Sequence, residues 1–258
     1  MAQRYVRVQS KTGQLHYGLL QPDRSVKVLD APPWLQGQPA DVELSASDYT
    51  LLAPCAPSKV LAVGKNYAQH AEEMGGKPPS EPLLFIKPST AVTSAGATIF
   101  YPSQSQQVDY EGELAVVIGE RCACVSPEQA PSKIWVYNIA NDFNARDLQR
   151  KDGQWTRAKG FDSFCPLGPW IVRELSPAAQ LQTFLNDQKE PVQSASIDEM
   201  VFSPDTLVSY ISQIMTLLPG DVILTGTPAG VGPVTIGDRI RVEIEGIGIL
   251  ENTVAARQ

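Results

Sequence analysis

The sequence predicts an α+β or mostly β fold, with a small β domain ahead of the main body. The 258 residues include 19 Gly and 21 Pro, which divide the chain into many short segments of strand length. Helical periodicity is clear only over residues 204–217, so helices should be few. A doubly wound sheet would need helices that alternate regularly with strands, and this pattern is absent from the sequence.

Residues 1–53 are predicted to form the small N-terminal β domain. Its β-rich runs are separated by turn residues, and the predicted strands are 5–8, 16–20 and 25–29. The stretch 31–39 has the composition of an irregular loop. Pro54 and Pro57 bracket a connector, and residues 54–258 are predicted to form the larger, catalytic domain.

Two elements of the larger domain are well marked. Ser203 is a suitable N-cap for the helix 204–217, since Pro204 then occupies the first helical position. The apolar stripe of this helix is expected to pack into the core; it comprises Leu207, Val208, Ile211, Ile214 and Met215. Near the C-terminus, residues 239–245 alternate between apolar and charged side chains, which predicts a half-exposed strand that turns at 246–248.

Composition excludes several classes of function. Lys and Arg number 21 against 28 Asp and Glu, a net charge of −7, so a basic nucleic-acid footprint is not expected. Two histidines rule out a His-rich zinc or copper site. No apolar run approaches the roughly 20 residues that cross a bilayer. The N-terminus lacks a secretory signal, and the four cysteines do not resemble a disulfide framework, so we expect a cytoplasmic protein.

The segment 109–113 places three carboxylates at alternate positions. On a strand, residues two apart lie about 6.6 Å apart and point to one face, so Asp109, Glu111 and Glu113 should project together. Gly112 would leave the opposite face open to close packing. A solvated strand face tolerates this arrangement, whereas in a cleft each pair of charges costs roughly 2–3 kcal/mol and a cation would compensate. The apolar run 114–118 that follows favours the cleft.

A further carboxylate, Asp142, follows the predicted strand 134–140 and could complete a three-carboxylate site with Glu111 and Glu113. Oxygen ligands without histidine favour Mg²⁺ or Mn²⁺ over Zn²⁺. The segment around Lys159 could face this site. The loop 226–232 lacks the ending of a phosphate loop, but its backbone N–H groups could bind a carboxylate.

His70 is a candidate general base. Asn66 and Gly75 are predicted to cap a short helix in which His70 and Glu73, three residues apart, share one face. A carboxylate that holds one ring nitrogen leaves the other free to accept a proton. The alternative is a surface histidine on a short amphipathic helix. His16, which lacks an acidic neighbour, is expected to be structural.

Taken together, these motifs resemble the fumarylacetoacetate hydrolase family over residues 58–256. The matching segments occur in one order; they are VGKNYAQHAEE (63–73), LFIKPST (84–90), DYEGELAVVIG (109–119), NDFNARDLQ (141–149), AKGFDSFCPLGPW (158–170) and LTGTPAGVG (224–232). The resemblance implies a mixed β-roll with flanking helices, a homodimer, and a small domain before the catalytic one.

The resemblance also implies roles for individual residues. Glu111, Glu113 and Asp142 would ligate Mg²⁺ or Mn²⁺. The remaining roles concern the substrate: Lys159 would contact a substrate oxygen, Thr227 with Gly226 would bind the substrate carboxylate, Arg146 and Gln149 would lie near the site, and His70 and Glu73 would form a dyad on a lid.

The implied function is Mg²⁺-dependent cleavage of a C–C bond in small 2-oxo (di)carboxylic acids, by acylpyruvate hydrolysis or oxaloacetate decarboxylation. The dyad would activate water, and the metal with Lys159 would stabilise an enolate. Two alternatives stay open. One is an oxaloacetate tautomerase or 2-hydroxy-dienedioate isomerase on the same site, and the other is a non-catalytic metal-binding scaffold.

Overall fold

The computed structural model describes residues 3–257, and its architecture is set by three sheets with few helices. The largest sheet has twelve strands in the order β4-β3-β2-β1-β14-β12-β11-β17-β6-β7, with β5 beside β1 and β8 beside β14. A five-stranded sheet has the order β16-β15-β19-β20-β9, and a three-stranded sheet the order β13-β10-β18. The predicted α+β class is confirmed.

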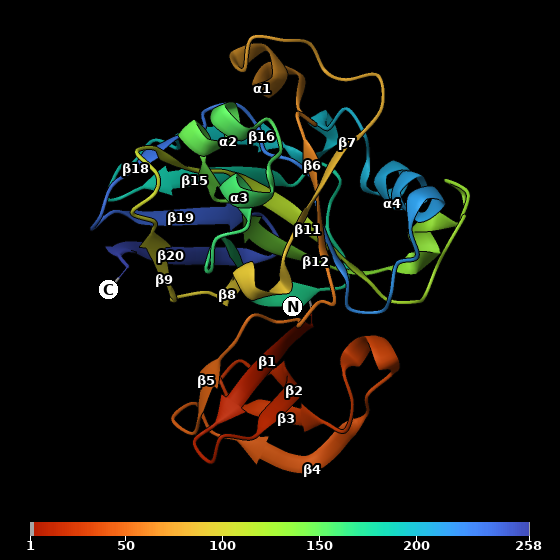
Figure 1. Cartoon of the computed structure of the whole chain (residues 1–258). Coiled ribbons are helices and arrows are strands. Elements are labelled where there is room, and N and C mark those ends of the chain that lie inside the picture. The colour runs from red at the N-terminus through yellow and green to blue at the C-terminus, as the bar shows by residue number, and fades with distance from the viewer. Residues whose placement is uncertain (1–2, 258) are drawn as a thin grey trace.

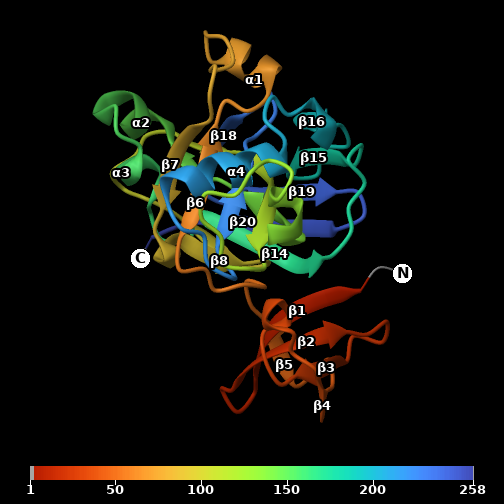
Figure 2. The same ribbon diagram turned by 90° about the vertical axis from the view of Figure 1, so that its right-hand side faces the viewer.

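The first strands form a lobe that lies apart from the main body in Figures 1 and 2. They are β1 (Arg4–Ser10), β2 (Leu15–Leu20), β3 (Val26–Leu29), β4 (Pro39–Leu44) and β5 (Tyr49–Leu51). The three strands predicted here are confirmed, whereas β4 and β5 were not predicted. The lobe joins the large sheet directly, because Arg4 and Tyr5 of β1 pair with Val172 and Ile171 of β14.

The remaining strands build the body. In the large sheet they are β6 (Val60–Gly64), β7 (Leu83–Lys87), β8 (Val92–Ser94), β11 (Gly112–Ile118), β12 (Ile134–Asn141), β14 (Cys165–Val172) and β17 (Val222–Leu224). In the smaller sheets they are β9 (Thr98–Tyr101), β10 (Val108–Tyr110), β13 (Asn144–Ala145), β15 (Gln180–Leu185), β16 (Gln193–Ser196), β18 (Gly232–Val234), β19 (Arg239–Ile244) and β20 (Gly248–Ala256).

The described helices are short. They are α1 (Ala68–Glu73), α2 (Arg146–Asp152), α3 (Thr156–Lys159) and α4 (Pro204–Ile214), with 3-10 turns η1 (Pro33–Leu35), η2 (Ser89–Ala91), η3 (Ala130–Lys133) and η4 (Ile197–Glu199). No described helix has the length and apolar character that crossing a bilayer requires. Helices α1 and α2 lie at the end of the body opposite the N-terminal lobe (Figures 1 and 2).

β11 is the central strand on which the site is built, and all its residues are buried. Leu114 packs against strands of the five-stranded sheet, while Val116 and Ile118 pack against α4. Ala115 and Val117 point to the opposite face. The predicted close packing at Gly112 is present, since a Cβ there would lie 2.3 Å from Thr183 Oγ1 of β15.

Helix α4 begins as the sequence predicts and ends earlier. The Ser203 side chain accepts a hydrogen bond from the Thr206 N–H, and Pro204 occupies the first turn. The helix stops at Ile214 and not at 217, because Leu217 exchanges backbone hydrogen bonds with Cys122. Because of this pairing, residues 215–217 are not part of the helix.

The predicted N-cap of the helix that carries His70 is wrong. Tyr67 occupies the cap position of α1 and makes no side-chain cap hydrogen bond. Asn66 is instead fully buried, and its side chain bonds the backbone of Phe202 and Thr225. Asn66 therefore ties the start of the α1 segment to two distant loops, which a pattern of neighbouring residues does not reveal.

Asp221 fastens the connector between the lobe and the body. Its fully buried carboxylate accepts hydrogen bonds from Ser58 Oγ at 2.6 Å and Leu218 N at 2.8 Å, and it pairs with Lys59. Replacing Asp221 by alanine leaves these donors without an acceptor, so we expect the free energy of unfolding to fall by about 2–4 kcal/mol. Chemical denaturation measures this change. Asp187→Ala, which removes an exposed pair with Arg239, should change it by less than about 1 kcal/mol; equal effects would contradict the prediction.

Candidate metal centre

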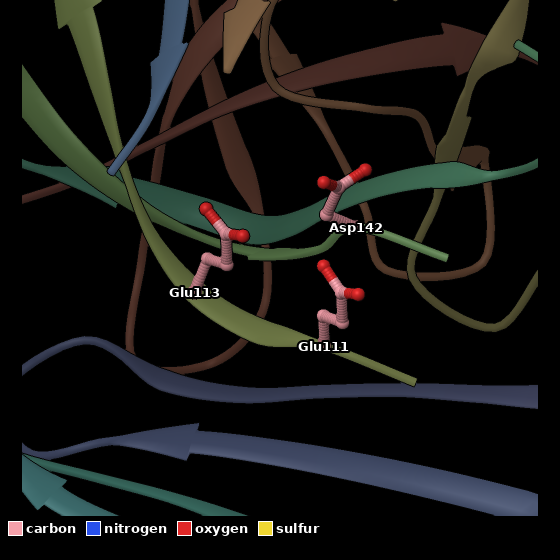
Figure 3. A group of neighbouring side chains, drawn as sticks. All are labelled: Glu111, Glu113 and Asp142. Carbon is pink, nitrogen blue, oxygen red and sulfur yellow. The ribbon is translucent and has the colours of Figure 1, made fainter. Parts of the chain in front are cut away.

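Three buried carboxylates converge at one end of β11. Glu111 precedes the strand, Glu113 lies within it, and Asp142 follows β12, so the pairing of β11 with β12 brings them together. The Asp142 N–H donates to the Glu111 carbonyl at 2.8 Å, which fixes this junction. Each side chain offers an oxygen within 4.8 Å of the others, and Figure 3 shows the three groups turned toward a common space. The solvated-face alternative is therefore wrong.

Asp109 does not join this group. β10 and β11 belong to different sheets and are separated at Glu111, so the alternation that would align Asp109 with the other two carboxylates is broken. Its carboxylate instead accepts a hydrogen bond from Arg146 Nε at 2.8 Å. Arg146 also donates to Glu111 through Nη2 at 2.6 Å, so this guanidinium links Asp109 to the centre.

Two buried lysines supply most of the local positive charge. Lys159 Nζ lies 2.6 Å from both Glu111 Oε2 and Asp142 Oδ2. Lys87, also completely buried, pairs with the other oxygen of Asp142. Lys87 was not among the predicted site residues, although it lies in the segment 84–90 that carries the family resemblance. Its placement next to a run of apolar strand residues was the available signal.

Glu113 is the carboxylate of the three that makes no ion pair within 4.0 Å among the described residues, although the charge of Lys159 lies near enough to lower its pKa. It accepts one hydrogen bond, from the Gly226 N–H at 2.6 Å. Burial and the neighbouring charges of Asp142 and Glu111 raise its pKa well above the usual value. Burial acts in the same direction on Glu111, but Lys159 and Arg146 outweigh it and lower the pKa of Glu111 to about 2. A divalent cation fits this donor set, because it would supply the counter-charge that Glu113 lacks.

The raised pKa of Glu113 predicts how metal binding depends on pH. Because the raised pKa of Glu113 means that a proton competes with the metal, the apparent affinity for Mn²⁺ should rise with pH, by up to about tenfold per pH unit, as long as Glu113 is still protonated. Calorimetric titration of the metal-free protein measures this slope and the protons released. A pH-independent affinity with no proton release would contradict the prediction.

The dyad is formed, with the His70 side chain buried and the Glu73 side chain 34% exposed. His70 Nδ1 lies 3.0 Å from Glu73 Oε2, and Glu73 Oε1 accepts a hydrogen bond from the Gly230 N–H at 3.0 Å. His70 has only 5% of its surface exposed, so the surface-histidine alternative is wrong. The loop that follows β17 therefore supports both the metal centre, through Gly226, and the dyad, through Gly230.

The other predicted site residues lie close to the triad, and they differ in the hydrogen bonds that they already make within the protein. Thr227 donates its hydroxyl proton to the Gly112 carbonyl at 2.8 Å and accepts from Gln193. Gln149 accepts from Arg146 at 2.7 Å. The Gly226 N–H, expected to meet a substrate carboxylate, is donated to Glu113, so in this structure Gly226 holds a metal-centre carboxylate.

These groups surround one narrow cavity of about 60 Å³, large enough for a small molecule only. The lining residues are Val63, Gly64, Lys65, His70, Met74, Phe85, Glu111, Glu113, Asp142, Arg146, Gln149, Trp155, Lys159 and Thr227. The lining combines charged side chains with apolar and aromatic ones. The cavity therefore combines a cation site, a histidine and a lysine around one small space.

Comparison with known proteins agrees with this arrangement. Residues 59–255 match the family model described as fumarylacetoacetate (FAA) hydrolase C-terminal, and residues 3–54 match Rv2993c-like, N-terminal. The mitochondrial oxaloacetate tautomerase FAHD2A of Bos taurus is 42% identical over 82% of this chain and 71% of its own length.

Two solved structures are also similar. A 2-hydroxyhepta-2,4-diene-1,7-dioate isomerase from Mycobacterium marinum is 41% identical with a TM-score of 0.90, covering 99% of both chains. A fumarylpyruvate hydrolase from Pseudomonas aeruginosa, in complex with Mn²⁺ and pyruvate, is 35% identical with a TM-score of 0.74 and covers 81% of this chain and 92% of its own.

Proposed function

Because this chain belongs to the fumarylacetoacetate hydrolase family, we propose that it is a divalent-metal-dependent enzyme that forms the enolate of a small 2-oxo (di)carboxylic acid. The observation that carries this proposal is one cavity lined by a buried carboxylate triad, a buried lysine and a histidine paired with a carboxylate. Such a combination stabilises negative charge on substrate oxygens and moves a proton nearby.

Glu111, Glu113 and Asp142 would hold Mg²⁺ or Mn²⁺. When bound, the cation supplies positive charge next to the carboxylate and keto oxygens of the substrate. Lys159 lines the same cavity, and its ammonium, which in this structure donates to Glu111 and Asp142, would stabilise the enolate oxygen by its positive charge. Arg146, fixed by Asp109 and Gln149, holds Glu111 in place and keeps it ionised.

His70 would move the proton at C3 of the substrate. Glu73 holds Nδ1, which leaves Nε2 to accept or deliver a proton. Gly230 holds Glu73 in turn, so the imidazole has a fixed orientation. The apolar and aromatic lining residues would limit the access of water to the carbanionic carbon, which would protect the enolate until His70 reprotonates it.

We place keto–enol tautomerisation or double-bond isomerisation first among the reactions. The named relatives that support it are the oxaloacetate tautomerase and the dienedioate isomerase, at 42% and 41% identity. This order differs from the order the sequence favoured. The second candidate is C–C cleavage, by hydrolysis or decarboxylation: the His70–Glu73 pair is also suited to activating water, and the fumarylpyruvate hydrolase, at 35% identity, supports it.

A substrate panel tests the proposal. Enol-oxaloacetate, acetylpyruvate and fumarylpyruvate would be followed by ultraviolet absorbance with Mg²⁺, with Mn²⁺ and after EDTA. We expect metal-dependent loss of the enol, with slower or no cleavage of the two acylpyruvates. Faster cleavage than tautomerisation would put the second candidate first, and no turnover of any substrate by the metal-loaded protein would overturn both. Mg²⁺ as the resident ion and a homodimer are proposed on the family resemblance, and a cytoplasmic location on the cysteine content.

A further inference from the structure

Lys65 is a cavity residue to which the proposed chemistry assigns no task. It follows β6 and lines the same cavity as the carboxylate triad. Its Nζ lies 3.7 Å from the position that a Cβ would take at Gly76, in the turn that follows α1. The ammonium therefore ends on the side of the cavity formed by the α1 segment, the segment that also supplies His70 and Met74.

Lys65 differs from the other cations of the cavity in its partners. Lys159 pairs with Glu111 and Asp142, and Arg146 pairs with Asp109 and Glu111. Within residues 3–257, the Lys65 side chain makes neither an ion pair within 4.0 Å nor a hydrogen bond, although it is partly buried. Its positive charge is thus available to a ligand inside the cavity.

The backbone of Lys65 also indicates a fixed position. Its φ is +57°, a left-handed conformation that residues other than glycine rarely adopt. The segment is held on both sides: Gly64 lies against the Trp155 ring, where a Cβ would come within 2.9 Å, and Asn66 is bonded to distant loops. The lysine is therefore presented from a defined point of the cavity wall.

From these observations we infer that Lys65 is a specificity-determining residue that binds a second carboxylate at the distal end of the substrate. This rests on the proposed function, in which the triad and Lys159 engage the 2-oxo acid end. Because every other cavity cation is already paired with protein carboxylates, a diacid gains an ion pair at Lys65 that a monoacid lacks. The inference narrows the substrate class to 2-oxo dicarboxylates.

Two substrates with one carbon skeleton test this inference. The probes are the enol forms of oxaloacetate and of its 4-methyl ester, which differ in the distal charge. We expect the wild-type protein to prefer the diacid, and Lys65→Met to reduce the ratio of the two kcat/KM values by about 10- to 100-fold, mainly through KM. Lys65→Arg should keep most of the preference. Methionine and arginine are both unbranched at Cβ, so neither adds backbone strain at this φ beyond that of lysine.

Two controls distinguish a failure of the inference on Lys65 from a failure of the proposed function. Lys27→Met removes an exposed lysine from β3 in the N-terminal lobe and should leave the ratio unchanged. Inhibition by oxalate, which lacks a distal group, reports whether the 2-oxo acid end still binds in each Lys65 variant. If the wild-type protein turns over the diacid and Lys65→Met keeps the same ratio, the inference on Lys65 is overturned while the proposed function stands. If the wild-type protein acts on neither probe and does not bind oxalate, the proposed function itself fails.

Discussion

Glu113→Gln is expected to abolish tight binding of Mg²⁺ and Mn²⁺ and to lower kcat/KM by about 10³-fold or more. Glutamine has the shape of glutamate, and its carbonyl oxygen can still accept the Gly226 hydrogen bond. What it lacks is the negative charge of Glu113, which makes no ion pair within 4.0 Å among the described side chains. Calorimetric titration with Mn²⁺ and assay with enol-oxaloacetate measure the two effects.

The same substitution should not destabilise the metal-free protein. Burial and two neighbouring carboxylates raise the pKa of Glu113, so its ionised form disfavours folding in the absence of metal. We therefore expect the free energy of unfolding without metal to stay the same or to rise by about 1–2 kcal/mol at neutral pH. Glu245→Gln, at an exposed turn, serves as the matched control. A Glu113→Gln protein that binds Mn²⁺ normally would show that the triad is not the metal centre.

His70→Gln is expected to lower kcat by about 10²- to 10⁴-fold with little change in metal affinity. A glutamine amide can keep a hydrogen bond to Glu73, but it cannot accept and release a proton as imidazole does. His70 is also absent from the triad, so Mn²⁺ titration should give the wild-type constant. Steady-state kinetics on enol-oxaloacetate gives kcat and KM separately.

Glu73→Gln is the companion variant. It keeps the imidazole but weakens its orientation and the stabilisation of its charged form, so a smaller loss of about 10- to 100-fold is expected. If His70→Gln retained full activity on every substrate while Glu73→Gln lost it, the dyad would not act through the imidazole. If His70→Gln lost only hydrolysis and kept tautomerisation, His70 would be the water-activating base of the second candidate reaction.

Local patterns predicted the parts of the fold whose partners are near in sequence. The Ser203 cap and the buried Leu207, Val208 and Ile211 of α4 follow from residues within a few turns, and His70 and Glu73 share a helix face. The predicted burial of Ile214 is wrong, since this residue is 55% exposed at the end of the helix, and Met215 lies beyond it. The strands β4 and β5 were missed although β4 alternates Ala40, Val42 and Leu44 with charged residues, because β4 begins at a proline and is largely exposed and β5 spans only three residues. Their stability comes from pairing with β3 and β1, which spacing alone does not show.

In the candidate site, too, contacts between residues near in sequence could be predicted, and contacts between distant segments could not. Glu111 and Glu113 could be selected from one strand, but the exclusion of Asp109 depends on a break between two sheets. Lys87 and Gly226 reach the centre from segments 55 residues from Asp142 and 113 residues from Glu113. Their contacts arise from strand order, which the family resemblance implies and residue spacing does not.

Exchange of the C3 protons of oxaloacetate with deuterium oxide, followed by proton NMR, tests the central claim most directly. Enolate formation is common to tautomerisation and cleavage, so exchange reports it whichever reaction follows. With Mg²⁺ or Mn²⁺, the wild-type protein is predicted to accelerate exchange well above the rate in buffer with the metal alone, and Glu113→Gln and His70→Gln are predicted to lose this acceleration. A metal-loaded wild-type protein that exchanges no faster than the metal alone would contradict the account.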